Sequence, residues 1–386
     1  MGWRFAQFSD AHLGSRLPGL TDAALAAVAG ATRESITAAL HSARDKGCEA
    51  VLVPGDLYDQ KGRDAAEQLL WFYEAVADFP TMHFFITPGE SDPFSASCPY
   101  SVVRPPSNVT LFVHQEWETL ELNGVTVTGR ALHNGAGPLQ MDWAGMPRAR
   151  QDGMSVLLLH CSLQGAEDGR ERRLPLMQVT QKDLLEAQYS YTALGHLHAR
   201  LEFPRRGGRA LAAYAGPPQC LGFDEQGPGG VLIGSLHADG AELAFHHTGK
   251  YNWQRRQVQL PELHVENYRL LLNAALNRLA RDLGASDIVK LSVGGELAAA
   301  RQGELQQVLE QAASAVYQLE TDTSALRLYG GPDQIELPQD SLLAEFLRRC
   351  TAEAAQSGAA AEVYELARRL GWRLFTGQGI PAEISQ

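Results

Sequence analysis

Four groups of acidic and histidine residues, each directly after a short apolar segment, constrain the fold of this chain more than any other feature. Short apolar runs are typical of buried strands, and in layered α/β folds ligand sites collect at strand ends. The sequence therefore predicts an α/β fold that brings distant polar side chains together. The groups are Asp10 and His12 after residues 3–8, Asp56 after 51–53, His160 after 156–159, and His196 with His198 after 191–194.

The first 250 residues alternate between helical and strand patterns. Apolar residues recur at helical spacing over residues 22–46, and Gly47 then suits the position just past a helix C-terminus. Asn123-Gly124 is a favoured two-residue hairpin turn between two strand patterns. We therefore expect a two-sheet β-sandwich flanked by helices. A second helix is expected at 64–78, and further strands at 82–86, 109–113, 119–122, 125–128, 209–215, 230–236 and 242–247.

The rest of the chain carries an α+β pattern of its own. Beyond a boundary near residues 249–260, strands and helices alternate over a length that suits a separate domain. We expect three parts: a main domain at 1–250, a small α+β domain at 251–335 and a helical C-terminal segment at 336–386. The expected elements of the α+β domain are strand 256–260, helix 265–283, strand 287–293, helix 303–319 and strand 325–329.

The residue types at the strand ends indicate a metal site. Carboxylate and imidazole ligands suit divalent ions such as manganese, zinc or iron, and the five scattered cysteines show no pair spaced for a thiolate site. Two ions about 4 Å apart can clamp the attacking and leaving oxygens of an in-line phosphoryl displacement. Such a pair of ions needs a carboxylate that bridges them.

The same motifs make the chain resemble the calcineurin-like metallophosphoesterase superfamily. Within it, the chain is similar to the SbcD-type nuclease subunits of DNA double-strand-break repair. The resemblance extends over nearly the whole chain and is most specific in residues 1–250. It is carried by Asp10-Ala-His12, Gly55-Asp56-Leu57-Tyr58-Asp59, His160 and Gly195-His196-Leu197-His198, with a softer signal in residues 214–219 and 229–233.

The resemblance implies two bound divalent ions, most readily Mn²⁺, with Zn²⁺, Fe²⁺ or Mg²⁺ as alternatives. It makes Asp56 the bridge between them. It also implies that the α+β domain is a capping domain that guides DNA over the metal centre. The remaining ligands that it assigns are Asp10, His12 and His198 for one ion, and Glu90, His160 and His196 for the other.

One motif departs from the family: Gly89-Glu90-Ser91-Asp92 stands where the family has Gly-Asn-His-Asp. Glu90 can still coordinate a metal through oxygen, but it adds a third negative charge, and a less positive site polarises a phosphodiester less strongly. Ser91 replaces the histidine that serves the family as general acid, a function worth about 10²–10⁴ in rate. Asp92, which orients that histidine in the family, loses its partner. We therefore expect a degenerate acid site at Ser91 and Asp92.

The centre is accordingly expected to bind metal and to turn over weakly. The competing interpretation is that another side chain takes over the acid role, with Glu90, His114 and His133 as the candidates. Sequence alone does not decide between these two readings of the site.

Three functions remain open. The first is a metal-dependent DNA nuclease subunit of an SbcCD-like repair complex, in which residues 336–386 dock an SbcC-type coiled-coil ATPase. The second is a catalytically impaired scaffold in the same complex. The third is a phosphatase or cyclic phosphodiesterase that acts on a small ester. The resemblance also allows a homodimer, and the C-terminal segment has the alternative of packing on its own chain.

The net charge of −12 bears on these functions, because duplex DNA is held by phosphate-facing cations. Either a partner supplies those cations or the substrate is small. Local basic groups that could line a substrate path are Arg148 and Arg150, residues 170–173 and residues 205–209.

Composition bears on domain number and on where the protein is expected to reside. With 386 residues, of which 45% are hydrophobic, the chain exceeds the size at which a single core usually stops growing. No segment reaches the 18 or so uncharged apolar residues of a membrane span. Unpaired cysteines fit reduced thiols. We expect a cytoplasmic protein without membrane contact.

Overall fold

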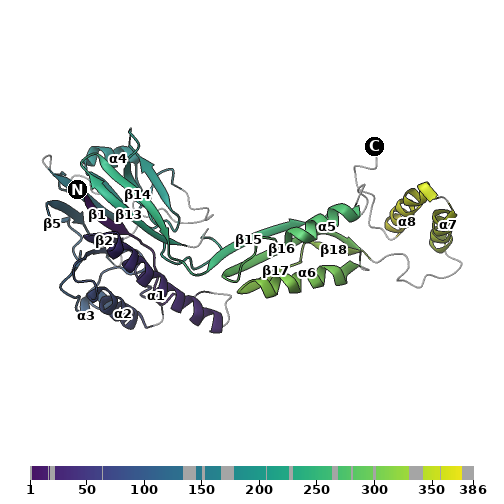
Figure 1. The fold of residues 1–386 in the computed structure, drawn as a ribbon, viewed down its shortest axis with the longest axis horizontal. Coiled ribbons are helices and arrows are strands. Elements are labelled where there is room, and N and C mark those ends of the chain that lie inside the picture. The colour runs from purple at the N-terminus through teal and green to yellow at the C-terminus, as the bar shows by residue number, and fades with distance from the viewer. Residues whose placement is uncertain are drawn as a thin grey trace. The chain divides into compact units, whose positions relative to one another are not determined.

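The computed structural model divides the chain into two compact units, Met1–Trp253 and Gln254–Gln386, and Figure 1 shows their elements. The residues that the structure describes are 2–15, 17, 22–62, 64–133, 145–149, 153–166, 178–205, 207–225, 229–262, 268–279, 281–298, 301–329, 342–356 and 358–375.

A 12-stranded sheet forms the body of the first unit. Its strand order is β4-β3-β2-β1-β13-β14-β12-β10-β7-β6-β5, with β11 paired to β12. The strands are β1 (Trp3–Gln7), β2 (Ala50–Pro54), β3 (His83–Thr87), β4 (Val109–Leu111), β5 (Glu118–Leu122), β6 (Val125–Gly129), β7 (Met154–His160), β10 (Tyr191–Gly195), β11 (Leu201–Pro204), β12 (Ala210–Tyr214), β13 (Gly230–His237) and β14 (Gly240–His247).

The sheet has two parallel halves joined by antiparallel strands. Strands β1 to β4 run parallel in one half, and β6, β7, β10 and β12 run parallel in the other. Strand β13 pairs antiparallel with β1 and β14, and β14 reaches β12 at Ala210 and Ala241. The sequence predicted two sheets, but the described strands form one continuous ladder, because β13 and β14 bridge the halves.

Apolar side chains explain why the halves lie against each other. One core cluster takes Phe5 from β1 and Leu52 from β2 together with Leu158 from β7 and Tyr191 from β10. Burying such side chains is worth about 1.5–3 kcal/mol each. Helices α1 (Asp22–Asp45), α2 (Ala65–Ala77) and α3 (Pro99–Val102) cover the outer face of the half with β1 to β4, and α4 (Gln181–Ala187) covers the outer face of the half with β7 and β10 (Figure 1).

Local sequence signals set several element ends as expected. Helix α1 ends before Gly47, whose φ is 70° and whose N–H donates to the Arg44 carbonyl. Asn123 and Gly124 both have positive φ, 51° and 80°, as a tight hairpin turn requires between β5 and β6. The helices predicted at 22–46 and 64–78 correspond to α1 and α2, so both are confirmed. A two-stranded sheet of β8 (Ser162–Leu163) and β9 (Gln178–Val179) was not predicted.

The second unit contains the predicted alternation of strands and helices. A four-stranded sheet has the order β15-β16-β17, with β18 paired to β16, and a core cluster that includes Leu272, Leu291 and Leu305 packs α5 and α6 on it. Its elements are β15 (Asn252–Gln259), α5 (Tyr268–Leu279), β16 (Asp287–Ala298), α6 (Gln302–Ala315), β17 (Gln318–Asp322) and β18 (Leu326–Tyr329).

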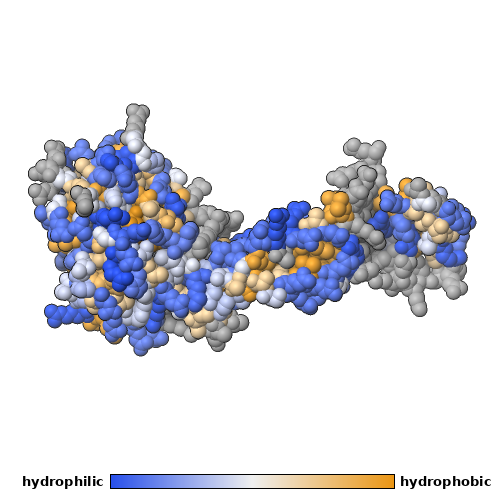
Figure 2. Space-filling view, viewed as in Figure 1, coloured by the Kyte–Doolittle hydropathy of each residue, from blue (hydrophilic) through white to orange (hydrophobic). Residues whose placement is uncertain are grey.

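Two amphipathic helices follow, α7 (Leu342–Gln356) and α8 (Ala361–Phe375), and they pack against each other. Figure 2 shows apolar residues at the surface of the second unit, among whose exposed side chains are Leu270, Leu328 and Val363. Among the described residues, no helix combines the length and the apolar character that crossing a membrane requires.

Candidate metal centre

The carboxyl ends of five parallel strands place the candidate ligands. Asp10 and His12 follow β1, Asp56 follows β2 and Glu90 follows β3, while His160 ends β7 and the His196–His198 pair follows β10. The two halves of the sheet meet closely here, because a Cβ at Gly195 would overlap the Pro54 carbonyl oxygen. Glycine at this position therefore lets the ligands of the two halves share one site.

Backbone strain is concentrated at the same residues. Eight non-glycine residues of the described chain have positive φ, and four of them are candidate ligands: Asp10 (55°), His12 (44°), Asp56 (54°) and His196 (107°). Such conformations are costly and cluster at functional sites, where the surrounding structure holds them.

Two groups of side chains converge in the centre. We call Asp10, His12 and His198 subsite A, and Glu90, His160 and His196 subsite B. In each group, one ligand atom of every residue lies within 4.8 Å of the others, so each group can hold a metal ion. Asp10, Asp56 and His160 form a third such group, which connects the two.

Asp56 lies between the subsites. One carboxylate oxygen, Oδ2, is 3.6 Å from His12 Nε2 of subsite A, and the other, Oδ1, is 3.6 Å from His160 Nε2 of subsite B. Asp56 is fully buried. Its two oxygens thus face different subsites, which is the arrangement that a bridging carboxylate needs.

Subsite A presents two imidazole nitrogens to one point. His12 Nδ1 lies 2.6 Å from Asp59 Oδ1, and His198 Nδ1 lies 2.5 Å from Glu225 Oε1, so both Nδ1 atoms donate to carboxylates. The two Nε2 atoms, left as acceptors, face each other at 3.1 Å. Two lone pairs at this distance require a proton or a cation between them.

Subsite B offers a buried acceptor as well. His160 Nδ1 lies 2.9 Å from the Pro54 carbonyl oxygen, which accepts its proton and leaves Nε2 as an acceptor. That Nε2 atom is buried and has no hydrogen-bond partner among the described residues. His196 Nδ1 lies 3.1 Å from Glu90 Oε1. The donor set of oxygen and imidazole nitrogen fits a divalent ion in both subsites.

The electrostatics also favour a cation. Burial alone would lower the pKa of His12, but its hydrogen bond to Asp59 and the neighbouring carboxylates raise it to about 9. Burial opposes ionisation of Asp56, yet the His160 and His12 imidazoles hold its pKa below its ordinary value. Without metal, the cluster thus takes up protons and keeps the Asp56 carboxylate charged.

The predicted acid site has other contacts. The Ser91 hydroxyl donates to Asp56 Oδ2 at 3.1 Å, and the Ser91 backbone N–H donates to Asp56 Oδ1 at 2.8 Å. The Asp92 carboxylate accepts hydrogen bonds from Tyr100 Oη and from three backbone N–H groups, those of Asp56, Leu57 and Gly89. Asp92 therefore ties the turn that carries Glu90 to the loop that carries Asp56.

The two histidines considered as substitute acids have contacts of their own. His133 Nε2 lies 2.9 Å from the Val113 carbonyl oxygen, and His114 Nε2 lies 3.9 Å from Glu118. Neither belongs to the ligand groups of the described residues. Cys161, next to His160, is buried, and burial raises the pKa of its thiol to about 12, so it remains a packing residue.

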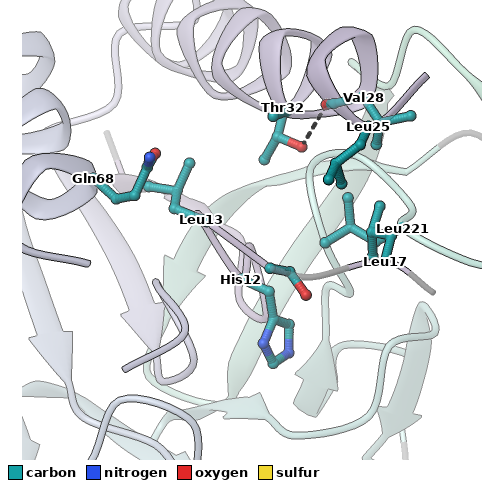
Figure 3. A pocket seen from close by; sticks show the side chains of 11 residues that line it. His12, Leu13, Leu17, Leu25, Val28, Thr32, Gln68 and Leu221 are labelled. Atoms are coloured by element: carbon teal, nitrogen blue, oxygen red, sulfur yellow. Dashed lines mark hydrogen bonds between the residues drawn. The ribbon is translucent and has the colours of Figure 1, made fainter. Parts of the chain in front are cut away.

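A small pocket adjoins subsite A at His12. Leu17, Leu25 and Leu221 point toward one another across it, and the His12 ring lies at its edge, as Figure 3 shows. The pocket contacts the metal centre at this one candidate ligand.

Two of the predicted basic residues have partners inside the protein. Arg209 pairs with Asp239 and Glu242, and the Arg205 guanidinium donates to the Tyr189 carbonyl. Arg150, Arg206 and residues 170–173 lie outside the described residues. The side chains of Arg205 and Arg209 are thus engaged in contacts inside the protein.

The sequence analysis did not identify three supporting residues. Asp59 and Glu225 accept hydrogen bonds from the imidazoles of His12 and His198, and Tyr100 donates one to Asp92. Asp59 could have been found, since it ends the same motif as Asp56. Glu225 and Tyr100 gave no signal, because neither follows a strand: Glu225 lies in a loop, and Tyr100 lies in the four-residue helix α3.

No protein-family model matches the sequence, and no curated protein matches it. Among solved structures, that of Haemophilus influenzae NAD nucleotidase (NadN) is similar at a TM-score of 0.32 and 11% sequence identity, over 81% of this chain. This chain covers 60% of that one. A likeness this low does not inform on function, so the geometry of the cluster carries the functional interpretation.

Proposed function

We propose that the chain is a divalent-metal-dependent phosphoesterase that cleaves phosphodiester bonds of DNA weakly. It would act as the nuclease subunit of an SbcCD-like repair complex in the cytoplasm. The observation that carries the proposal is Asp56, whose two oxygens face two separate ligand groups. A pair of sites that shares a carboxylate is the arrangement used to clamp a transferring phosphoryl group.

The residues of the centre take distinct roles in this proposal. Asp56 and the side chains of subsites A and B would hold two ions, which supply charge neutralisation and Lewis-acid polarisation of a phosphate when bound. Mn²⁺ is the ion we favour, since oxygen and imidazole ligands are mixed in both subsites. Asp92 fixes the turn that presents Glu90.

Weak turnover follows from Ser91. Its hydroxyl donates to Asp56, so it is engaged as a donor to a ligand and offers no proton of suitable pKa to a leaving oxygen. The absent general acid is worth about 10²–10⁴ in rate. The same contact favours the second candidate function, a metal-binding scaffold of the same complex without turnover.

The pairing of Arg209 with Asp239 and Glu242 favours a third candidate, hydrolysis of a small phosphate ester, because paired arginines offer few cations to a duplex. For the DNA function, we propose that residues 251–335 guide the substrate and that residues 336–386 dock an ATPase with an SbcC-type coiled coil. Homodimer formation belongs to the same proposal.

The test uses protein stripped of metal and reloaded with Mn²⁺. Cleavage of single-stranded and duplex DNA is compared with hydrolysis of bis(4-nitrophenyl) phosphate. The double variant Glu90→Asn and Ser91→His should raise the rate of DNA cleavage about 10²–10⁴-fold. The single variant Glu90→Asn removes the extra negative charge without adding a general acid, so it separates the effect of charge from the effect of the histidine.

The outcomes separate the three candidates. Bound Mn²⁺ without turnover in parent and double variant would point to the scaffold. Hydrolysis of the small diester alone would point to the third candidate. A parent that already cleaves DNA as fast as the double variant would contradict the proposed loss of the acid.

A further inference from the structure

The two subsites have the same types of candidate ligand. Each subsite has two imidazoles and one carboxylate of its own, and each faces one oxygen of Asp56. The types of the direct ligands therefore give neither ion an advantage. Any difference in affinity has to come from the burial of those ligands or from the groups behind them.

Behind subsite A stand two carboxylates. Asp59 holds Nδ1 of His12 at 2.6 Å, and Glu225 holds Nδ1 of His198 at 2.5 Å. Glu225 is itself fixed, because its other oxygen accepts the Leu221 backbone N–H at 2.6 Å. Its side chain is only 4% exposed, so water screens its charge little.

Behind subsite B, one imidazole is held by a neutral group. His160 Nδ1 meets a neutral group, the Pro54 carbonyl, at 2.9 Å. The carboxylate that belongs to this subsite, Glu90, is 38% exposed, whereas Asp10 of subsite A is fully buried. Solvent screens an exposed charge more than a buried one, so Glu90 attracts a cation less strongly than Asp10 does.

We propose that Asp59 and Glu225 are positioning residues that make subsite A the tighter of two unequal metal sites. A carboxylate behind an imidazole fixes the tautomer, orients the ring and strengthens its nitrogen as a ligand, and loss of such a partner lowers metal affinity about 10- to 100-fold. The two ions then bind in order, first to subsite A and then to subsite B. This inference rests on the two-ion centre of the proposed function.

Titration calorimetry of the metal-free full chain with Mn²⁺ tests the inference. The parent should bind two ions in two events of unequal affinity. Glu225→Gln and Asp59→Asn should each weaken the tighter event by about 10- to 100-fold and leave the weaker event in place. Asp224→Asn and Asp64→Asn are the matched controls, since both side chains are exposed neighbours in the same loops, and neither should change the affinities.

Thermal melting separates a positioning role from a structural one. The metal-free variants should fold but melt somewhat below the parent, because a neutral amide supports a protonated imidazole such as that of His12 less than a carboxylate does, and Mn²⁺ should stabilise them less than it stabilises the parent. Weakening of the looser event alone, unchanged affinities, or loss of the fold in both metal-free variants would contradict the inference. A parent that binds no Mn²⁺ would overturn the two-ion centre too, whereas two ions with unchanged variants would overturn only this inference.

Discussion

The hydrogen bond from Tyr100 to Asp92 offers a quantitative test of how the turn with Glu90 is held. The Tyr100 hydroxyl donates to Asp92 Oδ2 at 2.6 Å, and both residues are buried. A hydrogen bond to a charged group contributes about 1.5–3 kcal/mol to stability. Tyr100→Phe removes only this hydroxyl, so we expect it to lower the free energy of unfolding of the metal-free protein by that amount.

Tyr73→Phe is the matched control. Tyr73 belongs to the same apolar cluster as Tyr100, and its hydroxyl is buried without a hydrogen-bond partner among the described residues. Removing an unsatisfied buried hydroxyl leaves nothing unpaired, and the free energy of unfolding should stay the same or rise.

Urea unfolding of the full chain, followed by fluorescence, measures both variants through the shift of the midpoint at constant slope. Mn²⁺ titration adds a second measurement, because the turn that Asp92 fixes carries Glu90. Subsite B should therefore weaken in Tyr100→Phe and not in Tyr73→Phe. If Tyr73→Phe destabilises the protein as much as Tyr100→Phe does, the hydrogen bond to Asp92 does not hold this turn.

Three further predictions concern the metal centre. Asp56→Asn should weaken both ions, whereas His160→Ala should weaken one, as elemental analysis after dialysis against Mn²⁺ will show; equal losses in both variants would contradict a shared ligand. Gly89→Ala should abolish binding of both ions, because the added Cβ overlaps Asp56 Oδ1. Gly47→Ala is the control: a Cβ there meets open space at a φ of 70°, so this variant should lower the free energy of unfolding by about 1–2 kcal/mol and leave metal binding intact. The Mn²⁺ affinity should fall as the pH drops below about 9, because protons then compete for His12, whose pKa in the metal-free protein is raised to about 9, and an affinity that stays constant between pH 8 and pH 6 would contradict a ligand role for His12.

The positions of the candidate ligands could be identified from the sequence because each depends on a local pattern, while their binding of metal stays a prediction. Asp10, Asp56 and His196 all follow short apolar strands, and parallel strands place their carboxyl ends at the same edge. The helix that ends before Gly47 and the turn at Asn123-Gly124 are equally local. A few neighbouring residues suffice to set such features.

The rest depends on long-range pairing, which single-sequence patterns do not contain. The two predicted sheets form one ladder because β13 pairs with β1 across more than 200 residues of sequence. Glu225 reaches His198 only through the loop that follows β12. Asp92 accepts three backbone N–H groups whose directions no motif specifies.

The most direct measurement is anomalous diffraction at the manganese edge from crystals soaked in Mn²⁺. We expect two peaks about 3.5–4 Å apart, one beside His12 and His198 and one beside His160 and His196, with Asp56 contacting both. A single peak, or two peaks that Asp56 does not join, would contradict the shared centre from which the proposed chemistry follows.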